Sequence, residues 1–130
     1  MELQIDVASP EPVYEQIIRQ IQLSVQEGRL SPGTPLPSIR QLASDLDLNP
    51  NTVARAYRTL ETNRVIRTAG SRGTFVGSDA PSQIRTRNGQ DAVFQLTELV
   101  TLLMKKGMSA SQIETAFRSA IQTARTKGAL

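Results

Sequence analysis

The sequence contains no cysteine and no histidine. The missing thiols exclude a disulfide and a thiolate metal site, and they favour the cytoplasm over an oxidising compartment. With histidine also missing, neither the usual nucleophile–base pairs nor the common zinc-binding spacings can form, and the carboxylates are scattered rather than paired. We therefore expect no metal site, no cofactor and no enzymatic activity.

Long apolar runs are missing as well. No stretch approaches the roughly 18 consecutive apolar residues of a membrane-spanning helix, and no secretory signal peptide is recognisable. The sequence has no internal repeat and no low-complexity tract. Its 130 residues have room for one small domain and an appendage. We expect a cytoplasmic protein with no membrane partner.

Lysine is absent from the first 76 residues, where all eight cationic side chains are arginines. Six of these arginines (40, 55, 58, 64, 67 and 72) lie in residues 36–76 together with three acids, whereas residues 1–35 carry two arginines and five acids. Arginine binds phosphate and guanine through paired donors. This distribution indicates that residues 36–76 face an anionic partner.

Two consecutive helices are predicted in that segment. Ser38 is a preferred N-cap residue, and with Gln41 it completes an S-x-x-Q capping box. The apolar residues that follow have the helical spacing i, i+3, i+4 and i+7. They are Ile39, Leu42, Ala43 and Leu46. Asp47 ends this helix at a position suited to the left-handed conformation.

The second helix opens with Asn49 and Pro50, a favoured cap followed by a favoured first residue. Its apolar face carries Val53, Ala56, Tyr57 and Leu60, and its outer face carries Asn51, Arg55, Arg58 and Thr62. Asparagine and arginine side chains pair with adenine and guanine edges. We predict that this outer face contacts DNA bases; the alternative is an ordinary solvated helix face.

A β-hairpin is predicted next. Residues 65–68 and 74–76 are rich in β-branched side chains, and the connection between them contains Gly70, Arg72 and Gly73. The glycines permit positive φ angles and a close approach of the backbone to another surface. Beside a base-reading helix, Arg72 is placed to reach the DNA backbone or minor groove; the alternative is a solvated tip. The order helix, turn, helix, wing is that of a winged helix-turn-helix.

Arg40 lies in the first turn of its helix, where the macrodipole makes a cation unfavourable by roughly 0.3–1 kcal/mol. A DNA phosphate at this helix N-terminus would be bound by the free N–H groups and by Arg40 together. The alternative is an arginine that simply extends into water.

The flanking segments have the pattern of a scaffold. Alternation of apolar and polar residues over positions 3–7 predicts a short strand, and an apolar stripe predicts a core helix between Pro12 and Gly28. Residues 77–90 have almost no apolar content. They form either a linker or the start of a long helix that opens near Pro81.

Residues 91–130 contain two amphipathic helices that determine the predicted oligomeric state. Nine of the thirteen residues from Ala92 to Met104 are apolar, Gly107 ends that helix, and Ser109 opens the next one. Two helices cannot bury so wide an apolar surface against each other, and such exposed surfaces mark interfaces. We predict a dimerisation hairpin whose contacts come from Phe94, Leu96, Leu99, Val100, Leu103, Ile113, Phe117 and Ile121. The alternative is that the hairpin packs on its own winged helix.

As a set, these motifs resemble the GntR family of bacterial transcription regulators, and its YtrA subfamily in particular. The residues that carry the resemblance are Pro12–Ile17, Leu36-Pro37-Ser38, Arg40, Leu42-Ala43, Leu46, Asn49–Val53, Ala56-Tyr57, Leu60-Glu61 and Gly73–Val76. The resemblance covers residues 1–76 well and the tail more loosely. Where the family usually has glycine after each of the two helices, this sequence has Asp47 and Arg64, and we expect Asp47 or Asn63 to turn left-handed more readily than Arg64.

The resemblance implies that the arginine of the first helix, the start and outer face of the second, and the wing glycine touch DNA. The expected DNA-binding residues are Ser38, Arg40, Asn49, Asn51, Thr52, Arg55, Arg58, Arg72 and Gly73. Larger members of the family bind a small molecule through a separate domain, for which this chain is too short. A small-molecule effector therefore has no support in the sequence.

The sequence thus predicts a mainly α fold with a small β-wing. A winged helix-turn-helix DNA-binding domain spans residues 1–76, and a C-terminal two-helix dimerisation hairpin spans residues 91–130. The predicted function is sequence-specific regulation of transcription, as a repressor, by a homodimer on a palindromic double-stranded DNA operator. The alternative is a winged-helix module that binds another protein; it would show apolar anchors where the outer face carries Asn51, Arg55 and Arg58.

Overall fold

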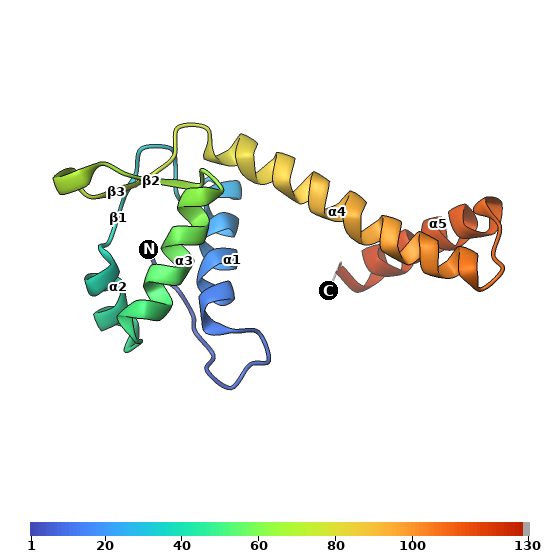
Figure 1. Cartoon of the computed structure of the whole chain (residues 1–130), viewed down its shortest axis with the longest axis horizontal. Coiled ribbons are helices and arrows are strands. Elements are labelled where there is room, and N and C mark those ends of the chain that lie inside the picture. The colour runs from blue at the N-terminus through green and yellow to red at the C-terminus, as the bar shows by residue number, and fades with distance from the viewer. Residues whose placement is uncertain (129–130) are drawn as a thin grey trace. The chain divides into compact units, whose positions relative to one another are not determined.

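The computed structural model describes residues 1–128, which are mainly helical with a small sheet (Figure 1). The predicted mainly α fold with a β-wing is confirmed. In chain order the elements are α1 (Val13–Gln26), β1 (Pro35–Leu36), α2 (Ile39–Leu46), α3 (Pro50–Thr62), β2 (Ile66–Thr68), the 3-10 turn η1 (Gly70–Arg72), β3 (Thr74–Val76), α4 (Ala80–Lys105) and α5 (Ala110–Gly128). The chain divides into two compact units, one from Met1 to Arg87 and one that begins at Asn88.

The core of the N-terminal unit lies between α1, α3 and the sheet. Ile17 and Ile21 of α1 and Val53 and Leu60 of α3 are fully buried, because the apolar stripe of each helix faces the other helix. Other members of this core are Leu3, Val25, Leu30, Leu36, Leu42, Ala43, Ala56, Tyr57, Val65, Ile66, Val76, Ala80 and Ile84. Helix α2 packs on α3 as the other half of the helix-turn-helix (Figure 1).

The segment before α1 is extended, but the predicted strand at positions 3–7 is wrong. Its backbone pairs with glutamine side chains of α1 instead of with a neighbouring strand. Gln20 accepts from the Gln4 N–H (2.8 Å) and donates to the Gln4 carbonyl (2.7 Å), and Gln16 does the same with Asp6 (2.9 and 2.8 Å). A carboxamide carries both a donor and an acceptor, so it can replace a strand's pairing groups.

The sheet has the strand order β1-β3-β2 and is antiparallel throughout. The wing strands β2 and β3 pair Ile66 with Val76 and Thr68 with Thr74. Strand β1 was not foreseen from the sequence, because two residues are too few to establish an alternating pattern. It pairs with β3, adds a third strand to the wing and leads into α2.

Both helices of the helix-turn-helix end in left-handed residues, Asp47 (φ 54°) and Arg64 (φ 61°). The expectation that Arg64 would avoid this conformation is wrong, and Asn63 keeps a negative φ of −85°. The reason is a Schellman motif, in which the Val65 N–H donates to the Leu60 carbonyl (2.9 Å) and the Arg64 N–H to the Glu61 carbonyl (3.0 Å). These bonds satisfy the end of α3 and direct Val65 into the core.

Residues 77–90 are mostly helical. Of the two predicted alternatives, the structure has the long helix, since α4 begins at Ala80 and carries Pro81 in its first turn. Ala80 and Ile84 are buried in the core of the N-terminal unit. The first two turns of α4 therefore belong to that unit.

The C-terminal unit contains the rest of α4 and α5, joined at Gly107 (φ 95°). Both halves of a capping box form at Ser109, the residue that the sequence predicts to open this second helix. The Gln112 N–H donates to Ser109 Oγ (3.2 Å) and the Ser109 N–H donates to Gln112 Oε1 (2.9 Å). Within its described residues, Ile113 is the buried hydrophobic side chain.

Candidate nucleic-acid interface

The start of α2 is fixed by two hydrogen bonds. Ser38 Oγ accepts from the Gln41 N–H (3.1 Å), as predicted, but the Gln41 side chain donates to Asp45 Oδ1 (2.7 Å) instead of accepting from the Ser38 N–H. Only half of this capping box is therefore formed. The Tyr57 hydroxyl of α3 donates to the Pro37 carbonyl (2.7 Å) and ties α3 to the residue before the cap. Arg40 is exposed in this first turn.

Tyr57 is a positioning residue that the sequence assigned only to the apolar core. Its ring is buried against the core and its hydroxyl reaches the α2 entry, so it sets the position of one helix against the other. Burial raises the pKa of Tyr57 to about 12, because the phenolate would lose its hydration. The hydroxyl remains a donor at physiological pH.

The start of α3 confirms the predicted cap. Asn49 Oδ1 accepts from the Asn51 N–H (2.8 Å), which leaves the Asn51 side chain exposed and without a partner among residues 1–128. Thr52 is half-buried on the next position, and Arg58 is exposed two turns along the helix. Asn49 therefore acts through the cap that it provides, whereas Asn51 and Arg58 present free donors.

Arg55 has a different environment from the other outer-face residues. Its guanidinium carbon lies 3.8 Å from the centroid of the Tyr14 ring, which belongs to α1. The sequence placed Tyr14 in the core stripe and missed this contact, because the two residues are far apart in the chain and no local pattern links them. The outer face of α3 is thus supported from the side by α1.

The wing tip has the backbone that its glycines predicted. Gly70 and Gly73 have φ angles of 56° and 108°, and the Ala69 N–H donates to the Gly73 carbonyl (2.8 Å) to close the loop. Arg72 is exposed at this tip. Thr68 Oγ1 donates to Glu61 of α3 (3.3 Å), which links the wing to that helix.

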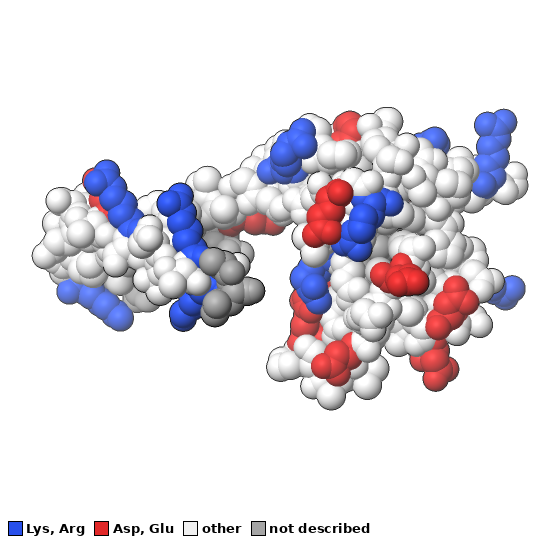
Figure 2. All heavy atoms as spheres, turned by 180° about the vertical axis from the view of Figure 1, so that it is seen from behind, with Lys and Arg blue, Asp and Glu red and all other residues white. Residues whose placement is uncertain are grey.

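The arginines of residues 36–76 are all exposed and none of them forms an ion pair. In the described part of the chain, ion pairs form at Arg19–Glu11 and Arg29–Glu27, outside this segment. The hydrogen bond and charge of Arg19 lower the pKa of the Glu11 carboxyl. On the face seen in Figure 2, acidic and basic side chains are mixed over the N-terminal unit. Residues 36–76 therefore carry six exposed arginines without an acidic partner in the described chain, and the cations that follow Ile84 also lack one there.

The C-terminal unit leaves most of its predicted dimerisation residues exposed. Phe94 (64%), Leu99 (51%) and Phe117 (47%) retain about half or more of their accessible surface. Leu96 and Ile121 are exposed as well, Val100 and Leu103 are half-buried, and Ile113 is buried. This apolar surface spans both helices of the hairpin.

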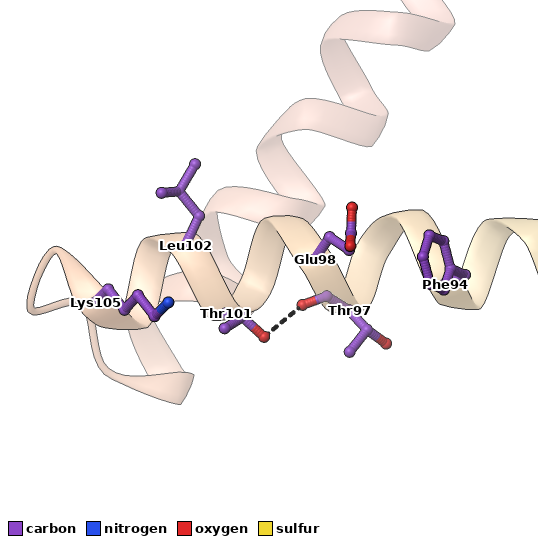
Figure 3. A pocket seen from close by; sticks show the side chains of 6 residues that line it. All are labelled: Phe94, Thr97, Glu98, Thr101, Leu102 and Lys105. Atoms are coloured by element: carbon purple, nitrogen blue, oxygen red, sulfur yellow. Dashed lines mark hydrogen bonds between the residues drawn. The ribbon is translucent and has the colours of Figure 1, made fainter.

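The hollows of the C-terminal unit do not bring together polar side chains from different helices. A hollow of about 490 Å³ is lined by six residues that all lie on α4, so it is one helix face (Figure 3). Two of them, Thr97 and Thr101, donate their hydroxyls to carbonyls of the same helix. A second hollow, of about 240 Å³, is apolar apart from Glu114 and is lined by Leu96, Val100, Ile113, Glu114 and Phe117.

Neither a metal-binding cluster nor a membrane-spanning helix is found in the described residues. Residues 1–128 contain no group of three carboxylate, histidine or cysteine side chains placed to hold a metal ion. Over the same range, no helix combines the length and the apolar character needed to cross a bilayer. Among the described residues, the exposed arginines of residues 36–76 and the apolar surface of the hairpin are therefore the candidate binding surfaces.

Comparison with known proteins identifies the family. Residues 13–76 match the profile of the bacterial regulatory proteins of the gntR family. The HTH-type transcriptional repressor YtrA of Bacillus subtilis is 43% identical over 82 residues, which cover 63% of this chain and 63% of that protein. The chain spans 60% to 66% of the length of that repressor and of two other curated relatives that it matches.

Solved structures resemble the chain over more of its length. A transcriptional regulator from Oenococcus oeni aligns with a TM-score of 0.69 at 32% identity, over 90% of this chain and 97% of its own. YtrA from Sulfolobus acidocaldarius, a GntR-family transcription factor, aligns with a TM-score of 0.57 at 30% identity, over 95% and 99%. The chain therefore belongs to the GntR family of regulatory proteins.

Proposed function

We propose that the protein is a cytoplasmic, sequence-specific DNA-binding transcription regulator that acts as a repressor on a palindromic operator. One observation carries this proposal: within the segment that matches the family, residues 36–76 expose six arginines against three acids, and none of these arginines forms an ion pair in the described chain. This excess of exposed positive charge suits a polyanion, since binding releases the counterions of the DNA.

The side chains divide into base contacts and phosphate contacts. Asn51, Arg55 and Arg58 extend from the exposed face of α3 and are of the types that pair with purine edges. Ser38 and Arg40 stand at the N-terminus of α2, where free backbone N–H groups favour a phosphate. Asn49 and Thr52 lie at the corresponding N-terminus of α3 and take the same role.

The wing supplies a third contact. Nothing lies within 4 Å of the position that a Cβ atom would occupy at Gly73, so the tip is open to a partner. A backbone without a side chain can approach the DNA, and Arg72 next to it is suited to a narrow minor groove.

A second copy of the chain is the proposed occupant of the apolar hairpin surface. Full burial of a leucine or phenylalanine side chain contributes roughly 1.5–3 kcal/mol, and several such side chains are exposed on α4 and α5. Two-fold dimers are the commonest closed assemblies, and a dimer presents two recognition helices to two half-sites. We propose residues 1–76 as the DNA-binding domain and residues 91–130 as the dimerisation region.

The sign of regulation is proposed from similarity. YtrA of Bacillus subtilis is named a transcriptional repressor, and it is similar to this chain over 82 residues. The relatives compared above are named as regulators, and we infer no enzymatic activity.

A protein-binding winged helix is the alternative function. Such a surface needs large apolar anchors. The exposed large hydrophobic side chains of residues 1–128 lie at positions 1, 7, 23 and between 93 and 121, and none lies on α2, α3 or the wing. The composition of the interface therefore favours DNA.

Selection from a pool of random duplexes by the full-length protein tests this proposal. We expect the selected sequences to converge on an inverted repeat, and binding to weaken with salt by a slope of about −0.9 per phosphate contact. A promoter that carries the repeat should be repressed by the protein in a reporter strain. A pool that stays random after selection would contradict the DNA-binding function.

A further inference from the structure

The contact between Arg55 and Tyr14 joins the proposed base-reading helix to α1. The guanidinium carbon lies 3.8 Å above the ring centroid, within the distance of a cation–π interaction. Arg55 is exposed, and it forms no ion pair with any described acid. The ring of Tyr14 is therefore the group that determines where this guanidinium lies in the free protein.

A stacked guanidinium differs from an ion-paired one in what it leaves free. The aromatic ring occupies the face of the planar group, whereas all five N–H donors point outward along its edge. An acidic partner would occupy two of those donors and would neutralise the charge. Stacking therefore orients Arg55 and keeps its whole donor edge and its charge available for DNA.

The other groups around Tyr14 support this arrangement. The Tyr14 hydroxyl donates to Glu15 Oε1 (3.1 Å), and donation to a carboxylate polarises the ring toward greater electron density. Tyr14 is half-buried at the start of α1, and α1 packs along α3, so its ring has little freedom to move away. The ring is a fixed platform beside a flexible arginine.

We propose that Tyr14 is a positioning residue for DNA recognition, which holds the guanidinium of Arg55 in the orientation that it uses on the DNA. This inference rests on the proposed function. Tyr14 itself makes no contact with bases; it reduces the conformational freedom that Arg55 would lose on binding. Loss of the Tyr14 ring should therefore lower both the affinity for DNA and the discrimination between bases, and only through its effect on Arg55.

A double-mutant cycle on full-length protein tests the coupling. The probe is the duplex selected by the wild type, with a second duplex changed at the base pair where Arg55→Ala relaxes preference. We expect Tyr14→Leu to weaken binding about threefold to fivefold per half-site and to reduce discrimination between the two duplexes. Tyr14→Phe keeps the ring and should stay within about twofold of the wild type. Tyr14→Leu combined with Arg55→Ala should bind no more weakly than Arg55→Ala alone.

A measurement without DNA separates the stack from the proposed function. In the free protein, the NMR signals of the Arg55 side chain should be shifted upfield by the ring, should stay shifted in Tyr14→Phe, and should return to ordinary values in Tyr14→Leu. Unshifted signals in the wild type would overturn the stack even if the protein binds DNA. Losses that multiply in the double variant, or an unchanged affinity of Tyr14→Leu, would overturn the positioning role. A wild type that selects no sequence would overturn the proposed function, and Tyr14's role with it.

Discussion

The two units of the chain differ in how far their apolar residues are buried. Of the buried hydrophobic residues in the described chain, all but Ile113 lie between Leu3 and Ile84. In the C-terminal unit, by contrast, side chains as large as Phe94 and Phe117 remain about half exposed or more. The first unit buries its apolar residues in a core formed by its own chain. The second unit is also rich in apolar residues but does not bury them within itself.

The polar groups of the N-terminal unit also divide into those that have a partner and those that lack one. In the N-terminal unit the helix ends and the N-terminal segment are satisfied by specific bonds, such as those of Gln16 and Tyr57. The arginines of residues 36–76 have no acidic partner among residues 1–128. We propose that each unit lacks a partner at one surface, a polyanion at the first unit and an apolar surface at the second.

Separating the units should have the largest effect. A fragment of residues 1–87 keeps the whole N-terminal core, including Ala80 and Ile84, so it should fold with nearly the thermal stability of that unit. Its affinity for a two-half-site operator should fall about 100-fold or more, since the half-sites are no longer linked. Binding titrations of fragment and full chain measure this difference.

The control for this fragment is one that ends at Gly77. It lacks two buried core residues and should melt at a lower temperature than the 1–87 fragment. If the two fragments melt together, α4 does not contribute to the N-terminal core. If the 1–87 fragment binds the operator like the full chain, the second unit has no role in affinity.

Two glycines, one from each unit, should respond in opposite directions to alanine. A Cβ at Gly77 would lie 2.7 Å from the Arg64 carbonyl oxygen, a backbone atom that cannot move away without displacing the turn. Gly77→Ala should cost about 1–3 kcal/mol. Gly89 lies in the exposed interior of α4 with nothing within 4 Å, and Gly89→Ala should stabilise by about 0.5–1 kcal/mol. Urea unfolding of both variants gives the two signs, and a loss at Gly89 would contradict the open environment of α4.

Base and phosphate contacts within the N-terminal unit should separate by specificity. Asn51→Ala should cost about 1–3 kcal/mol on the selected operator and relax preference at one position per half-site. Arg40→Ala should weaken binding equally on operator and random duplexes, and should lower the salt slope by about 1 per half-site. Affinities on both duplexes over a salt series distinguish the roles. An equal loss on both duplexes for Asn51→Ala would remove it from the base-reading residues.

A further prediction for the N-terminal unit concerns Tyr57. Tyr57→Phe removes the donor to the Pro37 carbonyl and should cost about 1 kcal/mol at neutral pH. The wild type carries an additional pH dependence, because the unfolded tyrosine releases its proton near pH 10 while the folded one has a pKa of about 12. The folded state then binds the extra proton, so stability falls between these values as pH rises. Urea unfolding across this range should show the fall in the wild type and a smaller fall in Tyr57→Phe; identical curves would contradict it.

The sequence was most informative where structure depends on neighbouring residues. The caps at Ser38, Asn49 and Ser109 and the left-handed Asp47 follow from contacts within one helical turn, and all four are present. The glycines of the wing tip follow from the same local logic.

What the sequence did not predict depends on distant residues. The stack of Arg55 on Tyr14, and the α1 glutamines that replace a strand partner for residues 3–7, join segments that no periodic pattern connects. Arg64 took the left-handed turn because two carbonyls of α3 needed donors, which outweighed its side-chain preference. For the interface, the sequence supplied residue types and faces, and the structure supplied the supports at Tyr14 and Tyr57.

Sedimentation equilibrium on two matched leucine variants tests most directly whether the C-terminal unit, and not the N-terminal one, binds an apolar partner. Leu99 on α4 and Leu23 on α1 are both large, exposed apolar residues (51% and 41%), one in each unit. The full chain and Leu23→Glu should both sediment as dimers at micromolar concentration, and Leu99→Glu should sediment as a folded monomer because a buried charge opposes the interface. A monomeric wild type with an intact fold, or a Leu99→Glu variant that stays dimeric, would contradict the account.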